Sequence, residues 1–465
     1  MRPCSQGIMF RSACHEFPMK ANEVDGSVVE ELNPDRRLLD GGQAHVSPEH
    51  AARGRAEIPG AGAGTLAGQH HSVIGYDGIT RLAIMVTPEW EGNVRDQASE
   101  ALSMIRTILR HQEEPMVLTM QNVFVADAAD APAIRRLFEA YFGEEMPLTI
   151  FVVQPPCDGA ALAVEAWAIS TRKVSVAHLG PHLVTVEHDG LRWVHASAGT
   201  LRRAGLTAFQ QAEQTFASLD KTLHAVGVPF RDVVRLWLYQ GGITEVEDGV
   251  ERYRELNRGR TDFYRHVEFP SNPLARHANG SGMYPASTGI GTGEHGLVLT
   301  ALAIQTSRDD VEVLSLENPH QISAFDYPAE YSKKSPKFSR AMAIRIADHV
   351  TTWVSGTASI VASETVFAGD IEKQTHQTLE NIENLIAGEN FSRQGWADAG
   401  ATLDDLAKVR VYVKRAEDYE KCRAVCEERL GTIPAVYALA NVCRPDLLVE
   451  IEGVAFSSIQ KQSDS

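Results

Sequence analysis

The sequence predicts an α+β fold in which one sheet-and-helix unit is written three times. A strand–helix–strand–helix–strand order recurs along the chain after about residue 70, and such recurrence marks a repeated structural unit. The helices carry apolar residues on one face at helical spacing, and the closing strands are rich in β-branched residues. Each unit should therefore form a sheet covered by two helices on one face. The bare faces need partners, so we expect an intramolecular pseudo-trimer.

The elements follow from periodicity in each copy. In the first helix, Val94, Ala98, Ala101, Leu102 and Ile105 recur at spacings of three and four and predict one buried face. The first copy is expected to contain segments 80–88, 94–110, 117–126, 131–143 and 161–169. The second should contain segments 192–199, 209–226, 233–242, 249–260 and 296–304. The third should contain segments 351–359, 371–386, 407–416, 418–431 and 447–456.

These copies set the expected domain boundaries. Residues 1–70, with mixed charge and the tract "PGAGAGTLAG", are expected to be disordered or loosely attached. Residues 71–170 form the first repeat and 171–320 the second, both degenerate. The third repeat, 321–465, carries the candidate catalytic strand.

Composition excludes several classes of protein. No stretch approaches the ~18 apolar residues of a membrane span, and the N-terminus lacks the apolar core of a secretory signal. The net charge is −17 with no offsetting basic cluster, which disfavours nucleic acid and anionic membranes as partners. An anionic small molecule needs only a few local cations. Six scattered cysteines indicate a reducing, cytoplasmic setting, and Cys422 and Cys426 lack the further ligands of a zinc site.

A carboxylate stands inside the apolar strand "LLVEIEGVAF". Glu450 would lie either on a solvent face or in a buried site, where a carboxylate must be paired, hydrogen-bonded or protonated. When the closing strands are aligned, Glu450 corresponds to Ala163 in the first copy and Val298 in the second. The alignment predicts at most one complete site per chain. Glu452 should share the face of Glu450, either as a partner that acts through Glu450 or as a structural residue, and the structural role is expected.

The third copy resembles the RidA/YjgF family through "QTLENIENLI", "AGATLDDLAKVRVYV", "DYEKCRAVCEERLG" and "LVEIEG". The family's proteins are homotrimers with active sites between subunits, so the resemblance supports RidA/YjgF-like (chorismate mutase-like/bacillus-type) units folded into a pseudo-trimer. Imine-hydrolysing members carry an arginine after Pro-Ala. This sequence has Val436, Ser287 and Thr149 there, which disfavours an imine deaminase.

A second resemblance covers about residues 172–456. The stretch "ENPHQISAFDYPAEYSKKSPKFSRA", with "YPASTGIG" before it and "WVSGTASIV" after it, is similar to the chorismatase family, which cleaves chorismate to pyruvate and a ring carboxylate. The resemblance implies Glu450 as the general acid that protonates the enolpyruvyl group, a role that burial would favour by raising its pKa. Carboxylate binding is assigned to Arg340, with Arg260 and Tyr331 as further candidates. Thr357 and Ala358 should line the same wall, and Arg444 could face a carboxylate or solvent.

Two further residues bear on the product. Gly356 together with Cys443 resembles the subtype that makes 3-hydroxybenzoate, whereas alanine in both places resembles the hydrolytic subtype that leaves a diene diol. A glycine at 356 would leave room for the ring to shift, and a thiol at 443 could assist proton removal. The sequence therefore predicts a 3-hydroxybenzoate synthase-like enzyme without metal or cofactor, as a monomer or small homo-oligomer. A hydrolytic variant, a 4-hydroxybenzoate product and a non-catalytic binding protein for a carboxylate metabolite remain open.

Overall fold

The computed structural model describes residues 64–67, 69–76, 78–201, 205–271, 282–326 and 334–459. The predicted disorder of residues 1–70 therefore lies mostly outside the described residues. Within that segment, however, Gly64–Ala67 forms strand β1, which pairs with the next strand through Leu66 opposite Val73. The folded region thus begins earlier than the sequence suggested, because the Gly-rich tract ends in an edge strand.

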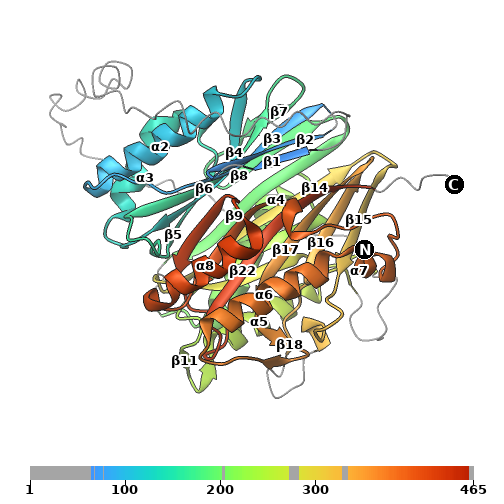
Figure 1. Ribbon diagram of the computed structural model, residues 1–465. Coiled ribbons are helices and arrows are strands. Elements are labelled where there is room, and N and C mark those ends of the chain that lie inside the picture. Colours follow the sequence, from blue (N-terminus) through green and yellow to red (C-terminus); the bar gives the residue numbers. More distant parts are fainter. Residues whose placement is uncertain are drawn as a thin grey trace, which may run out of the picture. The chain divides into compact units, whose positions relative to one another are not determined.

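Three six-stranded sheets have the same strand order (Figure 1). The first sheet runs β1 (Gly64–Ala67), β2 (His71–Tyr76), β3 (Ile79–Val86), β6 (Leu162–Ser170), β4 (Met116–Val125) and β5 (Leu148–Val153). The second runs β7 (Ser175–His178), β8 (Leu183–His188), β9 (Leu191–Leu201), β14 (Gly296–Thr306), β10 (Val233–Gly241) and β13 (Ala286–Thr292). The third runs β15 (Val311–Leu316), β16 (Ala341–Ile346), β17 (His349–Ala358), β22 (Val449–Ser458), β20 (Leu406–Val413) and β21 (Ala435–Leu439). In each sheet the last pair is parallel and the other pairs are antiparallel.

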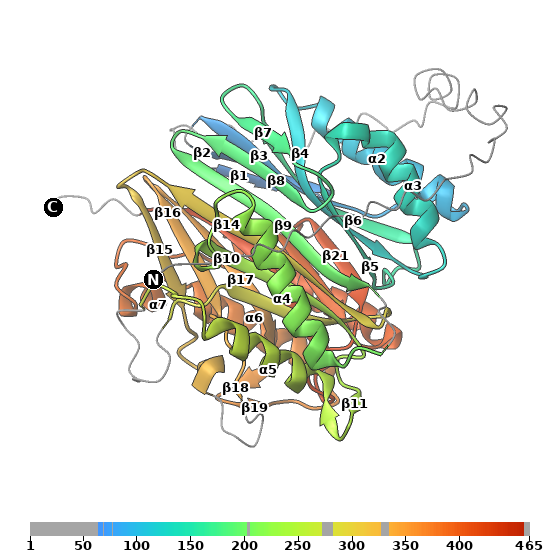
Figure 2. The same ribbon diagram turned by 180° about the vertical axis from the view of Figure 1, so that it is seen from behind.

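Two long helices pack on one face of each sheet, as predicted (Figures 1 and 2). They are α2 (Val94–Arg110) and α3 (Ala131–Phe142), α4 (Ala208–His224) and α5 (Arg252–Tyr264), and α6 (Ile371–Ile386) and α8 (Tyr419–Leu430). The first helix of each pair, α2, α4 and α6, is capped by Asn93, Thr207 and Asp370 respectively, whose side chains accept from backbone N–H groups of the first turn. The smaller elements are α7 (Gly388–Arg393), β11 (Val246–Glu247), β12 (Val250–Glu251), β18 (Ile360–Val361), β19 (Glu364–Thr365), η1 (Gly143–Glu145), η2 (Phe230–Asp232), η3 (Ala324–Asp326), η4 (Leu403–Asp405) and η5 (Ala416–Asp418).

The faces of the sheets that carry no helices share one hydrophobic core. Trp167 of the first sheet, Trp237 of the second and Trp353 of the third all belong to it. The ring centroids of Trp353 lie 5.5 Å from Trp167 and 6.0 Å from Trp237. Large aromatic side chains contribute most of the area that such a core buries. The bare faces of the predicted units are thus covered by one another.

The boundary between the second and third sheets differs from the predicted position 320/321. The third sheet begins at β15, Val311–Leu316, where Leu314 pairs with Ala343 of β16. Only the second half of β15 is buried, so its sequence lacks the apolar run that marks the central strands. No helix in the described part of the chain is long and apolar enough to cross a membrane.

Candidate active site

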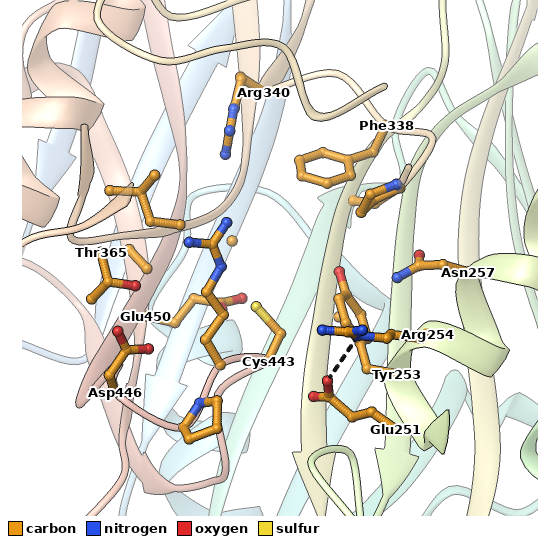
Figure 3. A pocket seen from close by; sticks show the side chains of 18 of the residues that line it. Glu251, Tyr253, Arg254, Asn257, Phe338, Arg340, Thr365, Cys443, Asp446 and Glu450 are labelled. Carbon is orange, nitrogen blue, oxygen red and sulfur yellow. Dashed lines mark ion pairs between the residues drawn. The ribbon is translucent and has the colours of Figure 1, made fainter. Parts of the chain in front are cut away.

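A cavity of about 330 Å³ opens between the second and third sheets (Figure 3). The second sheet contributes α5 and the start of β13, and the third contributes the ends of β17 and β22 with the loop between β21 and β22. Figure 3 shows Glu450 and Cys443 on one wall, and Tyr253 and Asn257 of α5 on the other. A cleft of this volume suits a small organic ligand.

Glu450 lines this cavity and is only 4% exposed, so the solvent-face alternative is wrong. It lies near the start of β22, between Ala358 of β17 and Tyr412 of β20. Burial and the nearby Glu452 raise the pKa of Glu450 to about 8, although Arg235 and Arg340 oppose the shift. At neutral pH this carboxyl group is therefore mostly protonated and can donate a proton.

Gly356 lies directly against the Glu450 carboxyl group. A Cβ atom at this position would overlap Glu450 Oε1 and lie 2.9 Å from Cδ and 3.0 Å from Cγ2 of Thr288. The backbone near Gly356 is irregular, because the pairing of β17 with β22 shifts between Val354 and Thr357. The sequence suggested that glycine leaves room for a ligand ring. The structure gives a more direct reason, since any side chain here would displace the carboxyl group.

Two buried arginines line the cavity. Arg340 is 3% exposed and donates through Nη2 to the Ile322 carbonyl oxygen at 3.2 Å. Arg260, on α5, is 2% exposed and donates to Asn257 Oδ1 at 2.5 Å. Among the described residues, no carboxylate lies within ion-pair distance of the Arg260 guanidinium. Two buried guanidinium groups facing one cavity are suited to a ligand with more than one carboxylate.

Glu317 is a second buried carboxyl group near this site. It accepts from the backbone N–H of Arg340 at 3.3 Å, and burial raises its pKa to about 7 despite the charge of Arg340. It is not among the residues that line the cavity. Its position indicates that it orients the segment carrying Arg340.

Cys443 and Arg444 also line the cavity, as expected for the turn before β22. Burial, and secondarily Glu450, raise the pKa of the Cys443 thiol to about 12, which argues against its resting form acting as a thiolate base. Arg444 donates to the Ser363 carbonyl oxygen at 2.8 Å and forms part of the same wall.

The remaining predicted site residues are Ala358, Thr357 and Tyr331. Ala358 lines the cavity, whereas Thr357 does not, because adjacent strand residues point to opposite faces. The Thr357 hydroxyl donates to the Ser355 carbonyl oxygen at 2.9 Å, so its expected place on the cavity wall is wrong. Tyr331 lies outside the described residues. Sequence reasoning missed Tyr253 and Asn257, although with Arg260 they recur at i, i+4 and i+7 on one face of α5.

Glu452 lies two residues beyond Glu450 and is fully engaged by polar partners. Its carboxylate is 2.7 Å from Arg235 Nη2 and 2.9 Å from Arg410 Nη1, and it accepts from Trp237 Nε1 at 2.9 Å and from the Thr288 hydroxyl. Burial opposes its ionisation, but Arg410 and Arg235 hold the pKa of Glu452 below its usual value. Glu452 is thus a structural anion, as predicted, and it also contributes to the raised pKa of Glu450.

Comparison with known proteins agrees with this arrangement. Residues 165–303 match the family described as chorismatase FkbO/Hyg5-like, N-terminal, and residues 333–457 match endoribonuclease L-PSP. A 3-hydroxybenzoate synthase of Streptomyces hygroscopicus is 34% identical over 279 residues, which cover 58% of this chain and 77% of that protein. A chorismatase of Streptomyces rapamycinicus is 35% identical over 276 residues, which cover 57% and 77%. A crystal structure of a chorismatase matches with a TM-score of 0.59 at 22% identity, covering 81% of this chain and 98% of that one.

An α+β fold that joins a RidA/L-PSP domain to a chorismatase-type domain defines a chorismatase-type enzyme. Both of the named relatives exceed 30% identity over more than two thirds of their length. This chain belongs to the chorismatase family.

Proposed function

We propose that this enzyme converts chorismate to 3-hydroxybenzoate and pyruvate, with Glu450 as the general acid. The observation that carries the proposal is a buried carboxyl group with a raised pKa, in a cavity that is also lined by Arg340 and Arg260. Chorismate is a dianion, so its binding adds negative charge and favours the protonated form of Glu450 further. The name of the Streptomyces hygroscopicus relative supports the same product.

The reaction needs a proton on the methylene carbon of the enolpyruvyl group. Transfer of the Glu450 proton to that carbon turns the side chain into an oxocarbenium ion and leaves a carboxylate on Glu450. Cleavage of the bond between ring carbon 3 and the ether oxygen then releases pyruvate, which keeps that oxygen as its keto group. The hydroxyl on ring carbon 4 attacks carbon 3 as this bond breaks, and the resulting epoxide opens and rearranges to 3-hydroxybenzoate. The proton that this hydroxyl loses restores the acid, so the conversion balances without water. The hydrolytic alternative consumes one water and leaves a diene diol.

The two ends of the substrate are assigned to different cations. Arg340 comes from the segment before β16 and Arg260 from α5, so they approach the cavity from the third and second sheets. We assign one substrate carboxylate to each guanidinium, with Arg444 as a further contact. This assignment also explains why the site lies between two sheets. The third sheet carries the acid Glu450, and α5 on the second sheet carries Arg260, which binds a carboxylate.

Gly356 and Cys443 are proposed to set the product. Gly356 lets the Glu450 carboxyl group reach into the cavity, and a neutral Cys443 thiol occupies the wall beside it. Because the pKa of the thiol is raised to about 12, we assign Cys443 to shaping the ring pocket rather than to accepting a proton in its resting state.

We also propose that the three sheets are arranged as an intramolecular pseudo-trimer. Their shared strand order, their common hydrophobic core and the contacts of Glu452 with residues of the second sheet support this arrangement. The cavity would then correspond to one of three clefts between neighbouring units.

The test is incubation of the purified protein with chorismate and identification of the products by chromatography, alongside Glu450→Gln. We expect 3-hydroxybenzoate and pyruvate in equal amounts, with turnover reduced by about 10³-fold in the variant. Wild-type activity should fall as pH rises through about 8, where Glu450 loses its proton. A diene diol product would keep the acid but refute the role of Gly356 and Cys443. Untouched chorismate with a folded protein would favour a non-catalytic binding protein.

A further inference from the structure

Glu165 is a buried carboxylate of the first sheet that forms ion pairs with the third. It lies on β6, is 0% exposed, and contacts Lys408 and Arg410 of β20. It also accepts from Asn122 Nδ2 at 2.9 Å. Glu165 does not line the cavity.

Glu165 occupies the position in the first sheet that Glu452 occupies in the third. On β6, Ala163 pairs with Phe124, and Glu165 follows two residues later opposite Asn122. On β22, Glu450 pairs with Tyr412, and Glu452 follows opposite Arg410. The two carboxylates therefore bind the same Arg410 guanidinium from two different sheets.

This cluster contains one more basic side chain than acidic side chains. It contains the cations Arg235, Lys408 and Arg410 and the anions Glu165 and Glu452, all less than 5% exposed. Buried charges depend strongly on their partners, because water does not screen them. Burial and the adjacent Arg410 lower the pKa of Lys408 well below its usual value, whereas the charge of Glu452 opposes that shift.

We propose that Glu165 is a positioning residue for the Glu450 site. Its negative charge offsets the positive charge of Lys408 and part of that of Arg410. These cations then do not offset the negative charge of Glu452, which keeps Glu450 protonated. Without the Glu165 charge, the same cations would offset Glu452, and the field at Glu450 would favour its ionised form. The first sheet would thus tune a site that lies between the other two sheets. This inference rests on the proposed role of Glu450 as the acid.

Other groups around Glu450 set the background for this effect. Arg235 of β10 and Arg340 of the segment before β16 favour the ionised form of Glu450, whereas Glu452 of its own strand opposes it. Tyr253 and Arg260 of α5, Tyr412 of β20 and Cys443 of the adjoining loop also face this region. None of them contacts Glu165 directly in the described structure, so a substitution at Glu165 changes one charge and leaves these groups in place.

The experiment compares Glu165→Gln, Lys408→Gln and the double variant with wild type. The readouts are the pH dependence of kcat/KM for chorismate and the titration of the Glu450 carboxyl band by infrared spectroscopy, assigned by its absence in Glu450→Gln. We expect Glu165→Gln to move the loss of activity and the Glu450 pKa to lower pH by about one unit. Lys408→Gln should move both to higher pH, and the double variant should lie close to wild type.

Glu187→Gln is the matched control, since Glu187 forms an exposed ion pair with Arg192 at 3.0 Å on the second sheet. It should leave both pH profiles unchanged. An unchanged Glu450 titration in folded Glu165→Gln would overturn the proposal, whatever happens to kcat. If Glu165→Gln does not fold, Lys408→Gln decides, and absence of the upward shift refutes the idea. If the infrared titration of Glu450 shifts as expected but the wild-type protein does not convert chorismate, the influence of Glu165 on Glu450 stands and the proposed reaction is wrong.

Discussion

Glu450 and Glu452 lie two residues apart on β22 and share one face, yet they belong to differently built regions. The region around Glu452 supplies it with Arg235, Arg410, Trp237 and Thr288, so its carboxylate is ionised and fixed. Among the described residues, the cavity around Glu450 encloses the side chain without a comparable set of donors, and the pKa of Glu450 is raised to about 8. Burial is common to both carboxyl groups. Their charge states differ because, in the part of the chain that the structure describes, Glu452 has cations in direct contact and Glu450 does not.

The other two sheets show which of these regions recurs. The first sheet keeps the inner carboxylate as Glu165 but has Ala163 at the outer position. The second sheet has Val298 and Thr300 at the two positions. The inner position is therefore used to join sheets, whereas the outer carboxyl group is found only on β22 among the three equivalent strands. This pattern fits one complete site per chain and predicts different consequences for changes at the two positions.

The largest effect on stability should come from Glu452→Leu. The substitution removes the carboxylate that pairs with Arg235 and one of the two carboxylates that pair with Arg410, and breaking a buried pair in this way costs about 3–5 kcal/mol. Denaturant unfolding at neutral pH measures the loss. Glu389→Leu is the exposed control, since the Glu389 side chain is 88% exposed, and it should change stability by less than about 0.5 kcal/mol. If Glu452→Leu also lowered stability by less than about 0.5 kcal/mol, the assignment of Glu452 as a structural anion would be wrong.

Glu450→Gln should have the opposite effect on stability, and the effect should depend on pH. In the folded protein Glu450 titrates at about 8, whereas its usual value is 4.5. Wild type therefore keeps full stability from this group below pH 4.5 and loses it as pH rises to about 8. Glutamine avoids the loss, so the variant should be more stable than wild type by about 2–4 kcal/mol at pH 9 and nearly equal at pH 4.5. Unfolding free energies of both proteins across this range provide the check, and a difference independent of pH would refute a neutral Glu450.

The same two regions show how much of the structure could be predicted from the sequence. Periodicity predicted the helix at 94–110 with its observed bounds. The apolar strand left Glu450 either buried or on a solvent face, and the resemblance to the chorismatase family favoured the buried position that the structure shows. The link between Glu165 and Arg410 could not be predicted, because it joins different sheets over 245 positions and neither strand pattern reveals it. Thr357 was misplaced because a motif was read as one continuous wall, although alternate strand residues face opposite sides.

Gly356→Ala tests the contact between the backbone and the acid, with the smallest expected effect of the three. The added methyl group would overlap the Glu450 carboxyl group and press on Thr288, so the acid must move by about 1 Å or more. Misplacement of a catalytic group on this scale reduces turnover by about 10²-fold. The measurement is kcat for chorismate together with the ratio of 3-hydroxybenzoate to diene diol. Gly75→Ala on β2 is the control, because a Cβ there meets no atom within 4 Å, and it should leave turnover unchanged. Full activity of Gly356→Ala with an unchanged product would show that the carboxyl group tolerates a side chain at this position, and the requirement for glycine beside the acid would then be wrong.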